Sequence, residues 1–498
     1  MPPCGPEPCG RLVPQCLNVG TIKRGCRFPA NAFSGAKNFV IPDNPDNSAL
    51  AKSLTLAAMS LGFGVVQLDV TIVNTSLNSI AATLGGGVPE LQWVVSAYTI
   101  TFAALILTAG ALGDRLGSRQ VFMWGFGVFT AASLACALAP NSAVLISARA
   151  VQGVGAAFLV PNSLALLNHA YPDENERGRA VGFWAAGASL ALTAGPLLGG
   201  ALATLVGWRS IFLVNLPIGI AGLWLTSRYA TETARSSGRQ LDLPGQAAVI
   251  GALACLTGAL IEGGASGWIN PWVLATFAAF IVLAALFVFQ ERRAPQPMLP
   301  LSLFRRRMFA LTSAVGFLVN IAFYGLIFVL SLYFQRLNGL SPLATGLAFL
   351  PMMGAVLPMN LFAAGASERF GATTVIAAGA AISGVGCIAL LGIVRGASYW
   401  SLGGQLFAIG AGLGLLVPPL TSTLLGSVEK ARSGIAAGVL NATRQTGSVI
   451  GVALFGSLVG REDAFISGVR TALIISIILL IGAALMIALG GRTSPHEP

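Results

Sequence analysis

Charged residues are scarce in this chain. Asp, Glu, Lys and Arg make up 9% of its 498 residues, whereas a soluble domain carries about 25%. So few charges cannot cover a water-facing surface, which excludes a soluble globular fold for most of the chain. Hydrophobic residues make up 55% and glycine contributes 61 residues, a composition typical of helices that pack closely inside a membrane.

Residues that carry enzymatic chemistry are also lacking. The chain has two histidines, no phosphate-binding loop with Lys followed by Ser or Thr, and no cysteine spacing typical of a metal site. An ATP-driven motor, a metal centre and a hydrolytic triad therefore have no support. We expect no enzymatic activity, no metal and no cofactor.

The N-terminal segment lacks both hydrophobic periodicity and the apolar core of a signal peptide. We interpret residues 1–51 as a disordered cytoplasmic tail; a wrongly assigned start and a metal-binding tail are the alternatives. Four of the seven cysteines lie in this segment: Cys4, Cys9, Cys16 and Cys26.

Beyond the tail, apolar segments follow one another, each long enough to cross about 30 Å of hydrocarbon. They predict an all-α membrane protein with fourteen transmembrane helices. These helices are expected near residues 54–80, 91–112, 119–139, 143–168, 178–204, 209–227, 244–263, 271–290, 308–334, 343–365, 373–393, 400–424, 433–459 and 468–489.

The basic residues test this layout. With the N-terminus in the cytoplasm, most of the 29 lysines and arginines fall in inner connections, where positive residues gather. The outer connections hold Arg209, Arg336, Arg395, Arg461 and Arg470. We therefore expect a multi-pass protein of the cell inner membrane with both termini cytoplasmic. Because the bases lie between apolar spans, the net charge of +11 reflects topology rather than a nucleic-acid-binding patch.

The sequence nearly repeats itself, which indicates two related halves. Three pairs of segments match in the same order: residues 113–117 with 367–371, residues 153–161 with 410–418, and the glycine pair Gly195 and Gly199 with Gly447 and Gly451. Two parallel halves around a central cavity are the architecture of one large transporter class.

The repeat divides the chain into expected domains. They are a six-helix bundle over residues 52–230, a two-helix insert with linkers over 231–300, a second six-helix bundle over 301–491, and a cytoplasmic tail over 492–498.

Two ionisable residues stand inside the expected helices of the first half. A carboxylate such as Asp69 costs ~2.5–3.5 kcal/mol deep in a membrane, so it should face a cavity or a partner. We expect it to take and release protons or to contact substrate; the alternative is a structural acid hydrogen-bonded to Thr71 or Asn74. Arg149, which the repeat aligns with Leu406, is expected to assist proton relay, or else to pin its helix to that of Asp69.

Further candidate residues fall into three groups. The loop after the second expected helix is interpreted as a conformational latch formed by Gly110, Gly113, Asp114, Arg115, Gly117 and Arg119. A stripe in the fifth expected helix serves packing or gating, two roles that are hard to separate: Gly187, Gly195, Pro196, Gly199 and Gly200. Cavity-lining candidates are Gln152, Asn441, Arg444 and Gln445.

Four of these segments resemble motifs of the major facilitator superfamily, and within it of the fourteen-helix multidrug:proton antiporters. They are the loop GALGDRLGSR (residues 110–119), the proton-transfer motif RAVQG (149–153), the exporter motif GASLALTAGPLLGG (187–200) and the helix-one motif LDVTIVN (68–74). Ser118 occupies a place that is often basic in the family. The resemblance covers residues 53 to 490, without the N-terminal tail.

The resemblance implies a major facilitator fold and a proton-coupled exporter of hydrophobic, drug-like small molecules that works by alternating access. The proton gradient would supply the energy. The expected partners are a small-molecule substrate, protons and the lipid bilayer, with a periplasmic adaptor protein as a further candidate and no nucleic acid. The alternatives are a dedicated exporter or uniporter of one metabolite, and a non-transporting membrane receptor or scaffold.

Overall fold

The computed structural model describes residues 45–235, 242–294, 297–392, 399–429, 433–460 and 464–491. The expected C-terminal tail of residues 492–498 lies outside this range, as does the N-terminal tail up to residue 44, with its four cysteines. Residues 45–51 were expected to belong to that tail, but they already form the first turns of α1.

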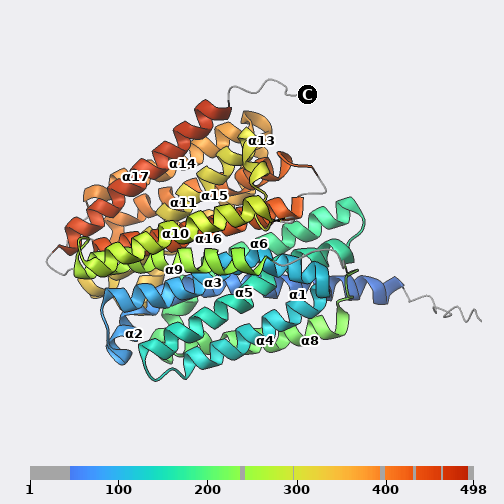
Figure 1. Ribbon diagram of the computed structural model, residues 1–498, viewed down its shortest axis with the longest axis horizontal. Helices are drawn as coiled ribbons and strands as arrows, with labels where there is room; N and C mark the ends of the chain where they lie inside the picture. Colours follow the sequence, from blue (N-terminus) through green and yellow to red (C-terminus); the bar gives the residue numbers. More distant parts are fainter. Residues whose placement is uncertain are drawn as a thin grey trace, which may run out of the picture. The chain divides into compact units, whose positions relative to one another are not determined.

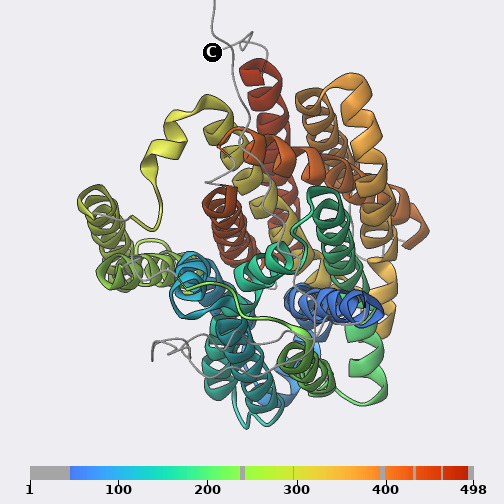
Figure 2. The ribbon, with the colours of Figure 1, turned by 90° about the vertical axis from the view of Figure 1, so that its right-hand side faces the viewer.

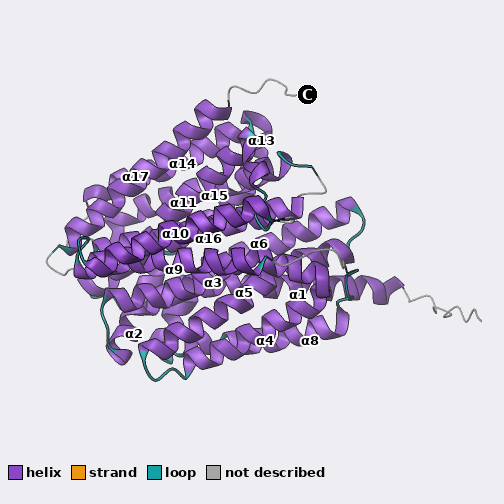
Figure 3. Ribbon diagram, viewed as in Figure 1, coloured by secondary structure: helices purple, strands orange, loops and turns teal. Residues whose placement is uncertain are grey.

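All regular secondary structure in the described residues is helical (Figure 3). Each expected transmembrane segment corresponds to one helix or to two or three consecutive ones (Figure 1). In the first half these are α1 (Pro45–Ile72) with η1 (Val73–Ser76) and α2 (Leu77–Leu84), α3 (Val88–Leu116), α4 (Ser118–Ala137), α5 (Ser142–Ala170), α6 (Glu174–Leu205), and α7 (Ser210–Leu213) with α8 (Asn215–Tyr229).

The insert contributes α9 (Leu243–Ser266) and α10 (Pro271–Arg293), which the short helix η2 (Leu301–Arg305) follows. The second half comprises α11 (Arg307–Leu332) with the π-helical turn η3 (Tyr333–Leu337), α12 (Pro342–Ala348) with α13 (Leu350–Phe370), α14 (Ala372–Ala389) with η4 (Leu390–Gly392), α15 (Tyr399–Gly426), α16 (Ser433–Leu458) and α17 (Phe465–Gly490).

Thirteen helical segments of the described chain are long and apolar enough to cross a membrane. The fourteenth, α16, has a comparable length but carries a polar run at its centre, from Asn441 to Thr446, which lowers its mean hydropathy. Polar residues are tolerated at membrane depth where they face the protein interior. The chain therefore forms the predicted all-α membrane protein.

Local sequence explains where several helices begin and end. The side chains of Asn141, Asp173 and Asn270 accept hydrogen bonds from backbone N–H groups in the first turns of α5, α6 and α10. Gly117 and Gly371 end α3 and α13 with φ angles of 103° and 84°, a conformation that favours glycine. These two glycines occupy matching places in the internal repeat.

The two halves pack their helices in the same way. In the first half α5 packs against α3 and α4, and α8 packs against α4; in the second half α15 packs against α13 and α14, and α17 packs against α14. The repeated glycines lie at a further matching contact, between α6 and α1 in the first half and between α16 and α11 in the second. A Cβ atom on Gly199 would meet the backbone of Ile72 in α1, and one on Gly451 would meet the backbone of Ile321 in α11. The structure thus confirms two six-helix bundles.

The insert lies beside both bundles. In a view along the helices, α9 and α10 stand to one side, next to α3 and α16 (Figure 2). One contact is made by Gln246 of α9, whose side-chain N–H donates to the carbonyl of Ala104 at 3.0 Å. The two extra helices therefore border the packing between α3 and α16, and leave the twofold arrangement of the bundles intact.

Hydrogen bonds join the two bundles where α2 meets α3; we call this the α2–α3 end. Gln92 of α3 donates to the carbonyl of Ala453 in α16 at 2.7 Å. At the same end Gln335 donates to the carbonyl of Asn74 at 3.1 Å, and Thr204 of α6 accepts from the backbone N–H of Leu343 at 3.1 Å. The bundles are therefore held together at this end.

A candidate proton-coupling site: a buried ion pair inside the first bundle

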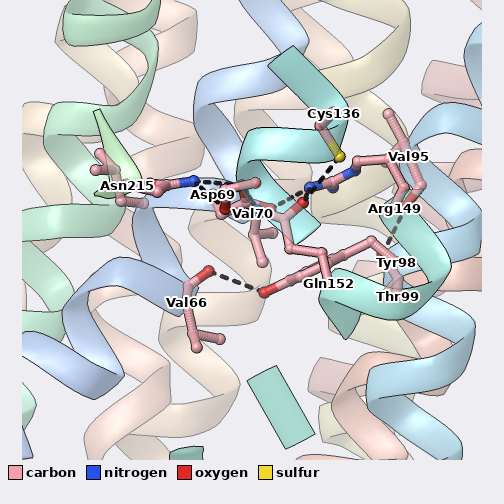
Figure 4. Close-up of polar contacts among 12 residues, drawn as sticks. Val66, Asp69, Val70, Val95, Tyr98, Thr99, Cys136, Arg149, Gln152 and Asn215 are labelled. Atoms are coloured by element: carbon pink, nitrogen blue, oxygen red, sulfur yellow. Dashed lines mark hydrogen bonds and ion pairs between the residues drawn. The ribbon is translucent and has the colours of Figure 1, made fainter. Parts of the chain in front are cut away.

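Asp69 lies one turn before the end of α1 and is fully buried. Its carboxylate forms an ion pair with the Nη1 atom of Arg149, which comes from the third turn of α5 (Figure 4). The Arg149 side chain is only 1% exposed. The two residues that sequence reasoning singled out separately, 80 positions apart, therefore form one site.

Neutral amides complete the site around the carboxylate. Gln152 donates from Nε2 to Asp69 Oδ1 at 2.8 Å, and Asn215 of α8 donates to the same oxygen at 3.2 Å (Figure 4). Gln152 also accepts from Arg149 Nη1 at 2.7 Å, and its Nε2 donates to the hydroxyl of Ser133 in α4 at 2.9 Å. Helices α1, α4, α5 and α8 thus meet around one negative charge.

Arg149 has further contacts that fix its guanidinium. Its Nε atom donates to the carbonyl of Val94 in α3 at 3.1 Å. Its Cζ atom lies 4.3 Å from the centroid of the Tyr98 ring and 5.8 Å from that of Phe212, distances at which a cation interacts with an aromatic face. The arginine is therefore held between a carboxylate, a carbonyl and two rings.

The hydrogen bonds around Asp69 depend on whether its carboxyl group carries a charge. Protonation of Asp69 would remove the negative charge that Arg149, Gln152 and Asn215 stabilise, and the hydrogen bonds would lose their charge-assisted strength. The carbonyl oxygen of the Asn215 side chain is buried without a hydrogen-bond partner in the described chain, so it could accept a bond from a protonated Asp69 after a small rotation. The site thus offers partners for both forms of the carboxyl group.

The alternative partners predicted for Asp69 are engaged elsewhere. Thr71 donates from its hydroxyl to the carbonyl of Leu192 in α6 at 3.0 Å, and Asn74 donates from its amide to the carbonyl of Val70 at 3.1 Å. The ion pair does tie α5 to α1, as the structural interpretation of Arg149 proposed. A role in proton transfer stays a prediction.

Sequence reasoning missed three members of the site: Ser133, Asn215 and Tyr98. A hydroxyl or an amide costs far less inside a membrane than a charge does. These residues therefore stand out little from other polar residues in the apolar segments. No sequence signal distinguishes Asn215 from these, because its approach to Asp69 depends on how α8 packs on α4.

The predicted latch residues lie at the junction of α3 and α4. Arg119 donates from Nη2 to the carbonyl of Ser227 at 2.7 Å, in the last turn of α8, while Asp114 is half-buried and Arg115 is exposed. Glu232, which sequence reasoning missed, accepts from the backbone N–H groups of Arg119 and Gln120 at 2.9 and 3.2 Å. This loop is therefore anchored to the segment that follows α8.

Two glycines of the latch loop lie at close contacts. A Cβ atom on Gly113 would meet the side chain of Asn162 in α5, and one on Gly117 would meet the carboxylate of Glu232. Gly110 has an ordinary contact, with Pro161 3.7 Å from the position of a Cβ atom. In both places the added atom would meet the end of a flexible side chain, which can shift, and at Gly117 the φ angle of 103° itself favours glycine.

The glycine stripe of α6 serves two interfaces. A Cβ atom on Gly195 would meet the side chain of Thr71 in α1, within the first bundle. Gly200 faces the other bundle, where a Cβ atom would meet the backbone of Pro342 in α12, and the carbonyl of Pro196 lies close to Gly346. Gly187 has looser surroundings, because a Cβ atom there would lie 3.7 Å from the side chain of Ser60. The stripe thus brings both α1 and α12 close to α6.

The remaining cavity-lining candidates divide between the bundles. Gln152 belongs to the buried ion-pair site rather than to an open surface. In α16, Asn441 and Arg444 are half-buried, whereas Gln445 is buried and its Oε1 atom has no hydrogen-bond partner in the described chain. Leu406 and Ile409, which match Arg149 and Gln152 in the repeat, are buried apolar residues. The ion pair is therefore a feature of one bundle only.

Paired six-helix bundles, with an ion pair enclosed in one of them, define a membrane transporter of the two-bundle class. The chain belongs to the Major Facilitator Superfamily, which it matches over residues 59–452 and again over 313–498. Among solved structures, the fold is similar to a peptide transporter of the POT type, with a TM-score of 0.65 and 17% identity over 88% of this chain and 95% of that one.

Several curated relatives are bacterial resistance proteins. A methylenomycin A resistance protein of Streptomyces coelicolor is 39% identical over 80% of this chain and 84% of its own length. The multidrug resistance protein Stp of Mycobacterium tuberculosis is 39% identical over 81% of this chain and 75% of its own. The drug efflux pump JefA of the same species is 35% identical over 82% of this chain and 80% of its own length.

Proposed function

We propose that the protein is a proton-driven secondary transporter that exports hydrophobic, drug-like small molecules. The observation that carries this proposal is the enclosed carboxylate of Asp69, which is fully buried and paired with Arg149 in a chain that belongs to a transporter family. A charge buried at membrane depth is costly, and such residues commonly mark substrate or proton pathways. The names of the relatives, which refer to resistance and efflux, support export as the direction.

In this mechanism, Asp69 alternates between two forms. As a carboxylate it holds α1, α5 and α8 together through Arg149, Gln152 and Asn215. When a proton enters from outside, the neutral acid releases Arg149 from its ion pair and loosens this contact. The two bundles then rock about the space between them. Protons move inward in one half of the cycle, and substrate moves outward in the other half. The proton gradient supplies the energy, and no cofactor takes part.

The distribution of basic residues supports an orientation with both termini in the cytoplasm of the cell. Arg119, Arg179, Arg228 and Arg369 lie at the end where α3 meets α4, whereas Arg209 lies at the α2–α3 end. Because positive residues favour the cytoplasmic side, we place the first end inside and the α2–α3 end outside an inner membrane. A periplasmic adaptor protein remains a candidate partner.

Everted membrane vesicles test this function. After their lumen has been acidified, addition of a transported compound should release luminal protons, which a pH-sensitive dye detects. The Asp69→Asn variant should lose this release when the signal is compared at equal amounts of folded protein in the membrane. Proton release that survives intact in the variant would refute coupling through Asp69, and compound flux without any proton gradient would favour a uniporter.

A further inference from the structure

A second arginine lies inside the membrane-spanning part, on the opposite bundle. Arg444 is at the centre of α16, about 16 Å from the start of that helix at 1.5 Å per residue. Its counterpart in the matching helix of the first bundle is Leu192, by the alignment of Gly447 and Gly451 with Gly195 and Gly199. The internal repeat therefore gives no structural reason for a charge here.

The contacts of α16 show which way Arg444 points. Gly438 lies against Leu107 of α3, and Gly451 lies against Ile321 of α11. With 3.6 residues per turn, Arg444 falls on the arc between these two contacts.

The opposite arc of α16 is covered by the insert, because Ser457 contacts Gly264 of α9. Arg444 therefore faces the space between the bundles. Tyr324 of α11 and Ala442 of α16 also pack against the buried apolar cluster of the first bundle.

Arg444 differs from Arg149 in its partners. In the described chain it has neither a hydrogen bond nor an ion pair, and it is half-buried rather than enclosed. Its electrostatic neighbour is Tyr324 of α11, the helix that packs against α16. A guanidinium keeps its charge at any ordinary pH, so an unpaired one at this depth calls for an anion from outside the chain.

We propose that Arg444 and Tyr324 bind an anionic group of the transported compound, and that hydrophobic organic acids are therefore a substrate class. The planar fork of a guanidinium matches the two oxygens of a carboxylate, and the Tyr324 hydroxyl can donate a further bond. A lipid phosphate is excluded as the source of the anion, because Arg444 lies at the centre of a membrane-spanning helix. This inference rests on the proposed export function and names the substrate class for it.

The first bundle offers aromatic side chains for the apolar remainder of such a compound. Phe63 of α1 and Trp184 of α6 stack with their ring centroids 4.3 Å apart, and both pack against the same apolar cluster as Tyr324. This cluster offers aromatic partners for a planar apolar ring system. Binding sites of this kind are predominantly apolar, with a few polar groups that fix orientation.

Binding of matched fluorescent probes to the purified protein in nanodiscs tests the inference. The probes are 1-pyrenebutyrate and its primary amide, detected by energy transfer from tryptophan. The wild-type protein should bind the acid at least about tenfold more tightly than the amide, since hydrogen bonds to a charged group are stronger than those between neutral groups. The Arg444→Gln variant should lose that preference and keep its affinity for the amide, and Arg444→Lys should retain part of it.

The matched control is Arg179→Gln, which removes an exposed arginine at the start of α6 and should leave both affinities unchanged. Thermal unfolding checks that each variant is folded. An unchanged preference in Arg444→Gln, or wild-type protein that prefers the amide, would overturn the inference. If vesicles export neutral compounds while the acid does not bind, the inference fails and the export function stands; if no compound releases protons, the export function fails.

Discussion

At the scale of single residues, Asp69 and Arg149 depend on one another. Each is enclosed, and each is the other's ion-pair partner. Removing one member of a buried pair costs about 3–5 kcal/mol, because the remaining charge is left without compensation. Replacing both with neutral residues costs less, since no charge then stays buried.

This predicts a non-additive effect on stability. Asp69→Asn and Arg149→Gln should each lower the melting temperature of the purified protein substantially, and the double variant should melt at a higher temperature than either single variant. Thermal unfolding in one detergent, followed by tryptophan fluorescence, measures all three. A double variant whose loss equals the sum of the single losses would show that the two residues act independently.

The sequence located this pair because charge inside an apolar segment is conspicuous. It could not locate Asn215, whose amide donates to Asp69, or Ser133, since neutral polar residues occur in many of the helices. It offered Gln152 as a cavity-lining candidate, and in the structure this buried side chain donates to Asp69. Which polar groups converge is decided by how α1, α4, α5 and α8 are rotated about their axes, and that rotation is a property of packing.

At the scale of helices, close packing depends on glycine at defined positions. On α6, an added Cβ atom at Gly195 would meet the side chain of Thr71, whereas one at Gly182 would meet nothing within 4 Å. The two positions lie on the same helix and differ in their surroundings alone. They therefore form a matched pair for substitution.

Gly195→Ala should destabilise the protein by about 1–3 kcal/mol, the usual cost of overpacking. Gly182→Ala should be neutral or stabilising by up to about 1 kcal/mol, because alanine favours the helix. Melting temperatures and yields of the two purified variants measure this difference. Equal melting temperatures and yields of the two variants would mean that the contact between α6 and α1 accommodates the added methyl group without loss of stability.

The lengths of the apolar segments predicted where the helices lie. They did not predict where a helix is interrupted. The first expected helix is one continuous segment in the sequence, yet it is divided at Val73–Ser76 by the 3₁₀ turn η1. At this turn the carbonyl of Asn74 accepts hydrogen bonds from Ser331 and Gln335 of the second bundle. A contact across 257 residues has no local signal in the sequence.

At the scale of the whole transporter, the two bundles are joined at the α2–α3 end by Gln92, Gln335 and Thr204. Alternating access requires this end to open during each cycle. A cross-link across it should therefore stop transport. Thr204 and Leu343 offer a suitable pair, since their hydrogen bond of 3.1 Å crosses from α6 to α12.

The Thr204→Cys/Leu343→Cys variant, in a background without native cysteines, should lose at least about tenfold in transport when a short thiol cross-linker is added and recover after reduction. Lys52→Cys/Glu176→Cys is the control: these residues form an exposed ion pair at 3.0 Å within the first bundle, so their cross-link should leave transport intact. Full transport with the α2–α3 end cross-linked would refute rocking of the bundles.

The central claim is that Asp69 gains and loses a proton as substrate moves. Infrared difference spectroscopy of the protein in lipid, recorded as a transported compound is added, measures this directly, because a protonated carboxyl group has its own carbonyl band. The wild-type protein should show a carboxyl band that changes on substrate addition and is absent in Asp69→Asn, while Glu262→Gln, which alters an exposed acid at the end of α9, should retain it. A substrate-dependent carboxyl band that persists in Asp69→Asn would contradict the account.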